Sequence, residues 1–114
     1  MVMRRGDIYW VDLGDPVGSE PGYLRPAIVI QEDEFNNSNL ATTIILSMTG
    51  NIDYRKFPGC VLLKADETGL PKDSIANASQ IRTVNRARLV ECVGQLDDSV
   101  MYMVDNALKR VLGL

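Results

Sequence analysis

Short apolar runs, several of them alternating with polar residues, dominate the chain up to about residue 95. Alternation with a period of two is typical of half-buried strands, and short continuous apolar runs are typical of fully buried ones. The runs that predict strands are 7–13, 26–31, 42–48, 60–63, 81–84 and 89–94. Loops rich in Gly, Pro, Asn and Asp separate these runs, so the pattern predicts a small, mainly β barrel.

The last part of the chain changes to a helical period. Apolar residues recur there at spacings of three and four along one stripe, which predicts a helix over residues 97–112. The residues of this stripe are Met101, Val104, Leu108 and Val111. Lys109 and Arg110 suit the C-terminal end of a helix dipole, and Gly113 suits a stop. Further apolar residues lie off the stripe, and of these Met103 is our candidate for a homodimer contact.

The length of 114 residues is that of one domain, which we expect to span residues 1–114. No segment approaches the roughly 18 consecutive apolar residues of a membrane span, and no apolar secretory signal follows the N-terminal basic residues. We therefore expect a soluble, cytoplasmic protein that does not bind membranes. In that setting Cys60 and Cys92 are expected to be reduced, buried thiols.

The formal charge of −3 argues against non-specific binding of nucleic acid, which usually depends on a strong positive field. Any RNA site must therefore be a local basic patch, although each basic cluster can equally be a solvated surface. The candidates are Arg4, Arg5 and Arg25, then Arg55 and Lys56, and finally Arg82, Arg86 and Arg88.

The chain contains no histidine. This excludes the paired-histidine ribonuclease mechanism, the serine–histidine triad and most zinc sites. We expect neither a metal site nor a cofactor, because the acidic clusters are explained more simply as a loop and a helix start.

Arg25 precedes Pro26 at the start of an apolar strand, after a loop that contains Gly18 and Gly22. The proline favours an extended backbone at Arg25, and the glycines allow the loop to turn back over it. A planar guanidinium pairs well with two phosphate oxygens. Thr49 ends the run 42–49 just before Gly50, so its hydroxyl is predicted to lie at a strand end. A plain strand-end threonine is the alternative interpretation.

The order of several segments resembles the MazF/PemK family of bacterial toxin endoribonucleases. The segments are Gly6-Asp7-Ile8-Tyr9-Trp10-Val11-Asp12-Leu13, Gly18-Ser19-Glu20, Arg25-Pro26-Ala27-Ile28-Val29-Ile30, Asp73-Ser74-Ile75, Gln80-Ile81-Arg82-Thr83-Val84 and Arg88-Leu89. The resemblance covers nearly the whole chain, with the loop after Ile30 and residues 51–58 in variable regions. It implies an SH3-like β-barrel with a C-terminal helix, and a homodimer with RNA grooves near the subunit interface.

The resemblance also implies an activity and its residues. The family cleaves single-stranded RNA at specific sequences without a metal ion, leaving a 2′,3′-cyclic phosphate and a 5′-hydroxyl. By position, Arg25 and Thr49 form the catalytic pair. Glu20 faces the arginine in the family pattern, where a carboxylate can orient the guanidinium or the attacking hydroxyl, or act as base. The substrate-binding positions are Arg5, Val17, Ser19 and Gln80; for Gln80, a polar residue on a solvent-facing strand surface is an equal alternative.

The resemblance further implies a partner, a MazE-like antitoxin whose flexible acidic tail occupies the RNA groove. Two other functions remain open. CcdB-like poisons of DNA gyrase share the fold, but they carry a functional tryptophan near the C-terminus, whereas the single tryptophan here is Trp10. The second alternative is an RNA-binding barrel without catalysis.

Overall fold

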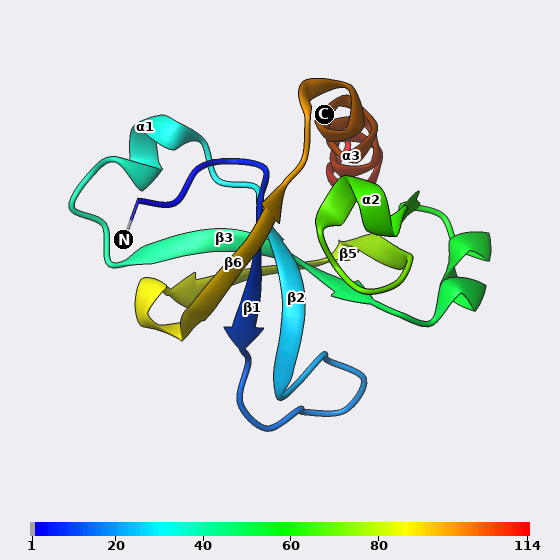
Figure 1. The fold of residues 1–114 in the computed structure, drawn as a ribbon, viewed down its shortest axis with the longest axis horizontal. Coiled ribbons are helices and arrows are strands. Elements are labelled where there is room, and N and C mark those ends of the chain that lie inside the picture. The colour runs from blue at the N-terminus through cyan, green and yellow to red at the C-terminus, as the bar shows by residue number, and fades with distance from the viewer. Residues whose placement is uncertain (1) are drawn as a thin grey trace.

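The structure is a computed structural model that describes residues 2–114 (Figure 1). The strands are β1 (Asp7–Asp12), β2 (Leu24–Val29), β3 (Thr42–Thr49), β4 (Cys60–Leu63), β5 (Ser74–Asn85) and β6 (Leu89–Gln95). The α-helices are α1 (Asp33–Asn36), α2 (Ala65–Thr68) and α3 (Asp98–Leu112), and the 3₁₀ turns are η1 (Ile52–Lys56) and η2 (Arg86–Arg88). The fold is thus mainly β with a C-terminal helix, as the sequence predicts.

The strands form one antiparallel sheet in the order β4-β5-β3-β2-β1-β6. The sheet is strongly twisted, so that β1 and β2 cross β3 and β5 steeply in Figure 1. It stays open between its edge strands β4 and β6, and the result is a barrel-like sheet.

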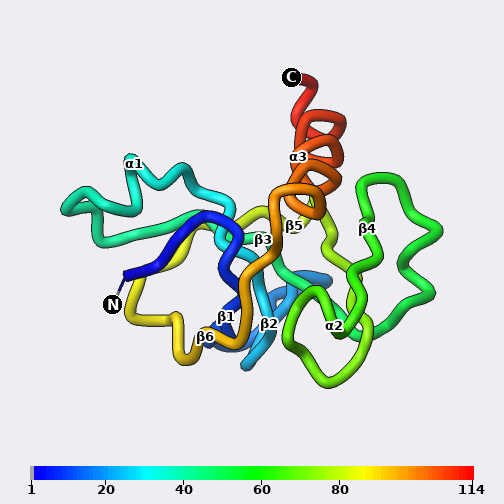
Figure 2. The backbone as a smooth tube through the Cα atoms, turned by 45° about the horizontal axis from the view of Figure 1, so that its top comes forward, coloured from blue at the N-terminus to red at the C-terminus, as the bar shows by residue number. Residues whose placement is uncertain are grey.

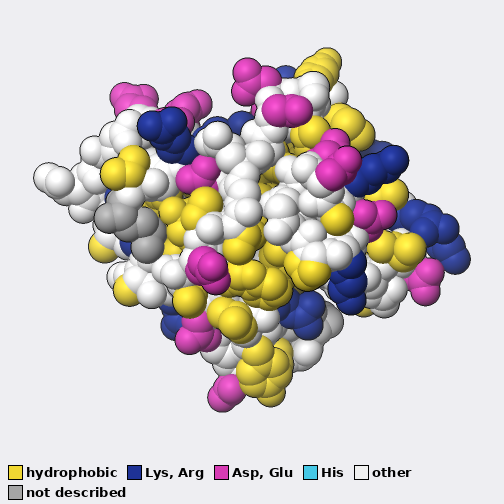
Figure 3. Space-filling view, in the orientation of Figure 1, with side chains coloured by type: hydrophobic (Ala, Val, Ile, Leu, Met, Phe, Trp, Pro, Cys, Tyr) yellow, Lys and Arg dark blue, Asp and Glu magenta, His cyan; other side chains and the backbone are white. Residues whose placement is uncertain are grey.

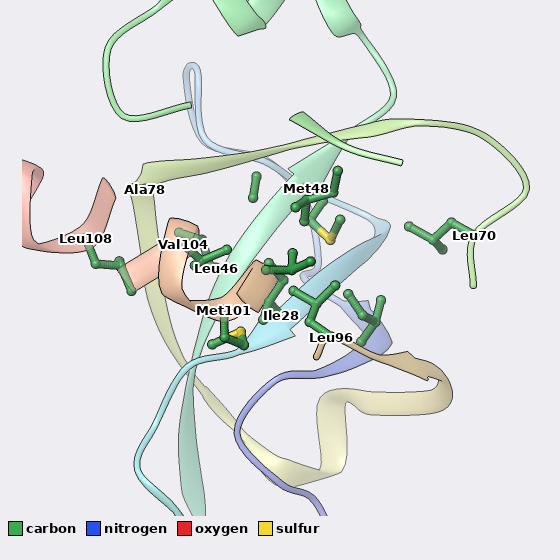
Figure 4. Close-up of a cluster of buried hydrophobic side chains, with 13 residues drawn as sticks. Ile28, Leu46, Met48, Leu70, Ala78, Leu96, Met101, Val104 and Leu108 are labelled. Carbon is green, nitrogen blue, oxygen red and sulfur yellow. The ribbon is translucent and has the colours of Figure 1, made fainter. Parts of the chain in front are cut away.

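Apolar side chains pack on both faces of this sheet, because neighbouring residues of a strand point to opposite faces. Ile28 and Leu46 belong to one core, which α3 covers with Met101, Val104 and Leu108 (Figure 4). The second core contains Met3, Tyr9, Val11, Leu13, Ala27, Val29, Ile45, Val84 and Leu89. The centre of the sheet is therefore buried on both sides.

Five of the predicted strands agree with the structure to within about two residues at each end, whereas β5 is much longer than predicted. It begins at Ser74 rather than at residue 81. Its first half includes Asn77 and Ser79, and these polar residues interrupt the apolar pattern from which strands are predicted.

The C-terminal helix begins at Asp98, with Asp97 as its N-cap, and ends at Leu112; the C-cap Gly113 has a left-handed φ of 72°. Its predicted stripe is buried except at Val111, where the prediction is wrong, because that side chain is 41% exposed. Figure 2 shows that the end of α3 extends away from the sheet, so the sheet covers the side chains of this last turn less well. Val100, in the first turn, is buried instead.

The two cysteines are free, but the prediction that both are buried is wrong. Cys60 is half-buried on the short edge strand β4, and Cys92 is exposed on the edge strand β6. Each edge strand has a neighbour on one side only, which leaves its side chains less covered. Within residues 2–114 no helix is long and apolar enough to cross a membrane.

Candidate active site

The site lies where β2 and β3 separate. Their register pairs Val29 with Ile45, Ile28 with Leu46 and Ala27 with Ser47, and no later pair is formed. Continuing this register would place Arg25 opposite Thr49. Because side chains two residues apart share a face, Arg25 and Thr49 lie on the same face as the pair Ala27 and Ser47.

A cavity of about 320 Å³ opens at this point. Its lining residues are Ser19, Glu20, Pro21, Arg25, Ser47, Met48, Thr49, Asn51, Tyr54, Asn77 and Gln80. The structure therefore brings together the three predicted catalytic residues and two of the predicted substrate-binding residues, Ser19 and Gln80.

The loop between β1 and β2 determines where Arg25 lies. The N–H of Leu13 donates to the carbonyl of Tyr23 (2.8 Å), and Tyr23 adopts a left-handed φ of 60°. A Cβ at Gly22 would lie 2.5 Å from Cδ of Pro16, so only glycine fits that tight turn. The loop thus folds back on itself immediately before the arginine.

Arg25 is half-buried, and its Nε donates to the carbonyl of Gly22 (3.2 Å). This is the one hydrogen bond that its side chain makes to the described residues. The terminal guanidinium nitrogens therefore remain available for an anion in the cavity, and their planar arrangement suits a phosphate.

Thr49 ends β3, and its Oγ1 accepts a hydrogen bond from the backbone N–H of Asn51 (3.2 Å). Since the oxygen is the acceptor in that contact, the hydroxyl proton is available to a ligand. Ser47, two residues earlier on the same face, is buried and lines the same cavity. Ser47 is not among the site residues predicted from the sequence, because it stands inside an apolar run.

An irregularity in β5 supplies the far wall of the cavity. The register with β3 moves from Leu46↔Ile81 to Met48↔Ala76, so two residues along β3 correspond to five along β5. The surplus residues bulge, and a bulge redirects side chains. Asn77 and Gln80 both line the cavity from this segment. The polar residues Asn77, Ser79 and Gln80, close together inside a strand, were the available sequence signal.

A second cavity, of about 220 Å³, continues the first. The residues that line both are Glu20, Pro21, Ser47 and Gln80, and the second adds Ile81 and Arg82. The two cavities form one groove, which we call the Arg25 groove, with Arg25 and Arg82 as its cations. Two cations along one groove suit a phosphodiester chain.

Glu20 lies on the exposed lip of this groove. Among residues 2–114 the one salt bridge joins Arg5 to Asp105, so Glu20 does not pair with Arg25 here. Its carboxylate is therefore open to a ligand, and its role stays a prediction.

Arg5 and Val17, the other two predicted substrate-binding residues, lie outside the groove. A terminal nitrogen of Arg5 is 2.6 Å from a carboxylate oxygen of Asp105, and its Nε donates to the carbonyl of Ile30 (2.8 Å). Arg5 thus attaches the N-terminal segment to α3. Val17 is 70% exposed in the β1–β2 loop. RNA contact by either residue stays a prediction.

A concave surface of about 800 Å³ lies beside α3, and Ile81 is the one residue that its lining shares with the Arg25 groove. Its apolar lining residues are Ile30, Ile44, Ile81, Met101, Leu108, Leu112 and Leu114, with Tyr102 as an aromatic member. We call it the α3 concavity. Met103 is exposed, as expected for a residue off the stripe, but it is not part of this surface.

Within the described residues no three His, Cys, Asp or Glu side chains form a group that could hold a metal ion. The groups that the groove offers are guanidinium, hydroxyl, carboxylate and amide. They can bind a phosphate, stabilise negative charge on it and hydrogen-bond to base edges.

Comparison with known proteins identifies relatives over the full chain. The family model described as PemK-like, MazF-like toxin of type II toxin-antitoxin system matches residues 4–112. Endoribonuclease MazF6 of Mycobacterium tuberculosis is 46% identical over 114 residues, which is all of both chains. Endoribonuclease EndoA of Bacillus subtilis is 40% identical over all of this chain and 97% of its own.

Solved structures show the same fold. MazF of Deinococcus radiodurans matches with a TM-score of 0.82 and 23% identity, covering 100% of this chain and 99% of its own. A mycobacterial endoribonuclease in complex with its cognate antitoxin has a TM-score of 0.80 at 23% identity, covering 98% of this chain and 96% of its own.

Proposed function

Because the chain belongs to the family of PemK-like, MazF-like toxins of type II toxin–antitoxin systems, we propose that it is an endoribonuclease whose active site is the Arg25 groove. The observation that carries this proposal is the placement of Arg25 and Thr49 on one face, where β2 and β3 separate. The enzyme cleaves single-stranded RNA in the cytoplasm, at specific sequences and without a metal ion.

The RNA supplies its own nucleophile. The 2′-hydroxyl oxygen attacks the adjacent phosphorus while its proton passes to a base, and the bond from phosphorus to the 5′-oxygen breaks. That oxygen takes up a proton, so the products are a 2′,3′-cyclic phosphate and a 5′-hydroxyl. Arg25 stabilises the extra negative charge of the phosphorane, because its free terminal nitrogens can donate to two oxygens.

The remaining groups position the RNA and move protons. A guanidinium does not give up a proton at neutral pH, so Arg25 is not the base. Thr49 donates its hydroxyl proton to a phosphate oxygen while its oxygen accepts from Asn51. Glu20, exposed on the groove lip, orients or deprotonates the 2′-hydroxyl. Ser19 and Gln80 bind base edges along the same groove and contribute to sequence selectivity.

Two protein partners complete the proposal. The first is a second copy of the chain, which covers the apolar residues of the α3 concavity. The second is a MazE-like antitoxin, since a related endoribonuclease was solved with its cognate antitoxin. A flexible acidic antitoxin segment competes with RNA because both bring negative charge to Arg25 and Arg82.

The test is incubation of the purified protein with a mixed RNA in EDTA. The expected result is a limited set of fragments with 5′-hydroxyl ends. RNA that is bound but intact would indicate an RNA-binding barrel, and inhibition of gyrase supercoiling without RNA cleavage would indicate a gyrase poison. Cleavage only after addition of a divalent metal would contradict the metal-independent mechanism.

A further inference from the structure

Two aromatic side chains are exposed at one end of the Arg25 groove. Tyr54 is 42% exposed and Phe57 is 58% exposed, and their ring centroids are 5.5 Å apart at an interplanar angle of 44°. Neither ring belongs to the two apolar cores. Exposed aromatic area is unfavourable in water, and two adjacent rings form a joint apolar surface that a ligand can cover.

The backbone of η1 places both rings on one side. A 3₁₀ helix has about three residues per turn, so positions three apart lie one above the other. Tyr54 and Phe57 have this spacing, and the N–H of Phe57 donates to the carbonyl of Tyr54 (3.0 Å). The two rings therefore act as one surface, and Tyr54 is the member that lines the groove.

Hydrogen bonds connect this surface to the catalytic threonine. The N–H of Asn51 donates to Oγ1 of Thr49 (3.2 Å), and Oδ1 of Asn51 accepts from the N–H of Asp53 (3.2 Å), which caps η1. The position of Tyr54 is thus determined relative to the hydroxyl that would contact the scissile phosphate.

Two cations accompany the rings. Arg55 and Lys56 are exposed at the end of η1, and neither belongs to the one salt bridge among the described residues. Basic side chains lie beside apolar ones at the right-hand edge of the molecule in Figure 3, where the green coil of η1 lies in Figure 1. Aromatic rings combined with free cations are the composition of single-strand nucleic-acid sites.

We propose that Tyr54 stacks against a nucleobase that neighbours the scissile phosphate. Phe57 supports the tyrosine ring, and Arg55 and Lys56 attract the adjoining phosphates. The inference rests on the proposed endoribonuclease function and adds a base subsite to it. Every base has an aromatic face, so this subsite contributes binding of the strand with little base preference, whereas hydrogen-bonding residues such as Gln80 supply selectivity.

The experiment begins with the wild type and one long transcript, on which the cleavage sites are mapped. A short RNA containing one site is then made uncleavable by a 2′-deoxy sugar at the scissile position. A parallel set lacks one base at a time among the three nucleotides on either side. Dissociation constants are measured for the wild type, Tyr54→Leu and Tyr54→Phe. Phe35→Leu is the control for loss of an exposed aromatic ring, because Phe35 is 50% exposed and lines neither the groove nor the α3 concavity.

Tyr54→Leu is expected to weaken binding of the intact RNA about tenfold to a hundredfold, the range of single stacking contacts, while Tyr54→Phe and Phe35→Leu stay near wild type. At one position, removal of the base should weaken RNA binding by the wild type by a similar factor. The same removal should hardly change RNA binding by Tyr54→Leu, because the tyrosine ring and the base act through the same contact.

Equal binding of the intact RNA by Tyr54→Leu and the wild type would overturn the subsite. It would also be overturned if, at every position, a missing base weakened binding by the same factor in Tyr54→Leu as in the wild type. Loss of binding in Tyr54→Leu to a protein partner alone, with RNA binding unchanged, would likewise overturn it and indicate a protein contact. No cleavage by the wild type would instead overturn the proposed function and the subsite with it.

Discussion

Arg25 and Thr49 lie on the same face of the sheet, each two residues beyond the last β2–β3 pair, Ala27 and Ser47. If the pairing continued, the Arg25 guanidinium and the Thr49 hydroxyl would belong to neighbouring residues of the β2–β3 ladder. The two strands separate at this point instead, and both residues line the cavity that opens there. Both side chains are therefore carried by strands whose central parts are buried on both sides. This rigidity suits a site that must hold charge-stabilising groups in place.

The first prediction concerns the hydroxyl of Thr49. Thr49→Val keeps the shape but removes the donor, and we expect cleavage to fall about a hundredfold, as for loss of one donor to a developing charge. Thr49→Ser should retain most activity. Single-turnover cleavage of a labelled RNA measures both. If the valine and serine variants cleave equally fast, the threonine is only a strand-end residue.

The second prediction concerns the contact between α2 and β6. A Cβ at Gly94 would lie 2.2 Å from the carbonyl oxygen of Thr68, so Gly94→Ala should reduce the free energy of unfolding by about 1–3 kcal/mol. Urea denaturation followed by fluorescence measures this. Gly50→Ala is the matched control, because its Cβ would meet the flexible end of Lys72 at 2.6 Å, and that side chain can move. Equal midpoints for the two variants would contradict the close backbone packing.

The third prediction identifies the homodimer surface. Leu112 is 55% exposed and lines the α3 concavity. Leu112→Asp should convert a dimer to a monomer at micromolar concentration, because an unpaired charge buried at a contact costs several kcal/mol. Met103→Glu, the candidate from the sequence, lies outside the concavity and should leave the dimer intact. Light scattering after size exclusion decides between the two faces, and a monomeric wild type would contradict both.

The fourth prediction is a pH dependence at the start of α3. Hydrogen bonds from the Ser99 hydroxyl and the Val100 N–H lower the pKa of Asp97 below its ordinary value of 3.8. Because the folded pKa is the lower one, the carboxylate stabilises the fold above pH 4, and this contribution is lost as the pH falls through the folded pKa. Asp97→Asn keeps a capping oxygen without the charge. Its melting temperature should be lower than that of the wild type at pH 6, and the difference should shrink towards pH 3. A constant difference would contradict the assignment.

The sequence predicted strand positions well wherever apolar residues alternate with polar ones or form a short continuous run, and it placed Arg25 and Thr49 at strand ends. It could not show that they face each other, because that depends on the register of two strands joined by a loop. The pairing of Arg5 with Asp105, 100 residues away, is also a tertiary property. The Asn77–Gln80 bulge was hidden because bulges break the period on which strand prediction depends.

The most direct test of the account is the cleavage rate of Arg25→Ala and Arg25→Lys against the wild type, with EDTA present and the same RNA. We expect both variants to fold, because the side chain makes one hydrogen bond to the described residues, to the carbonyl of Gly22. The alanine variant should lose about a hundredfold to a thousandfold in rate, and lysine should restore little, because it lacks the planar pair of donors. Near-wild-type cleavage by Arg25→Ala would contradict the central claim that this groove is the active site.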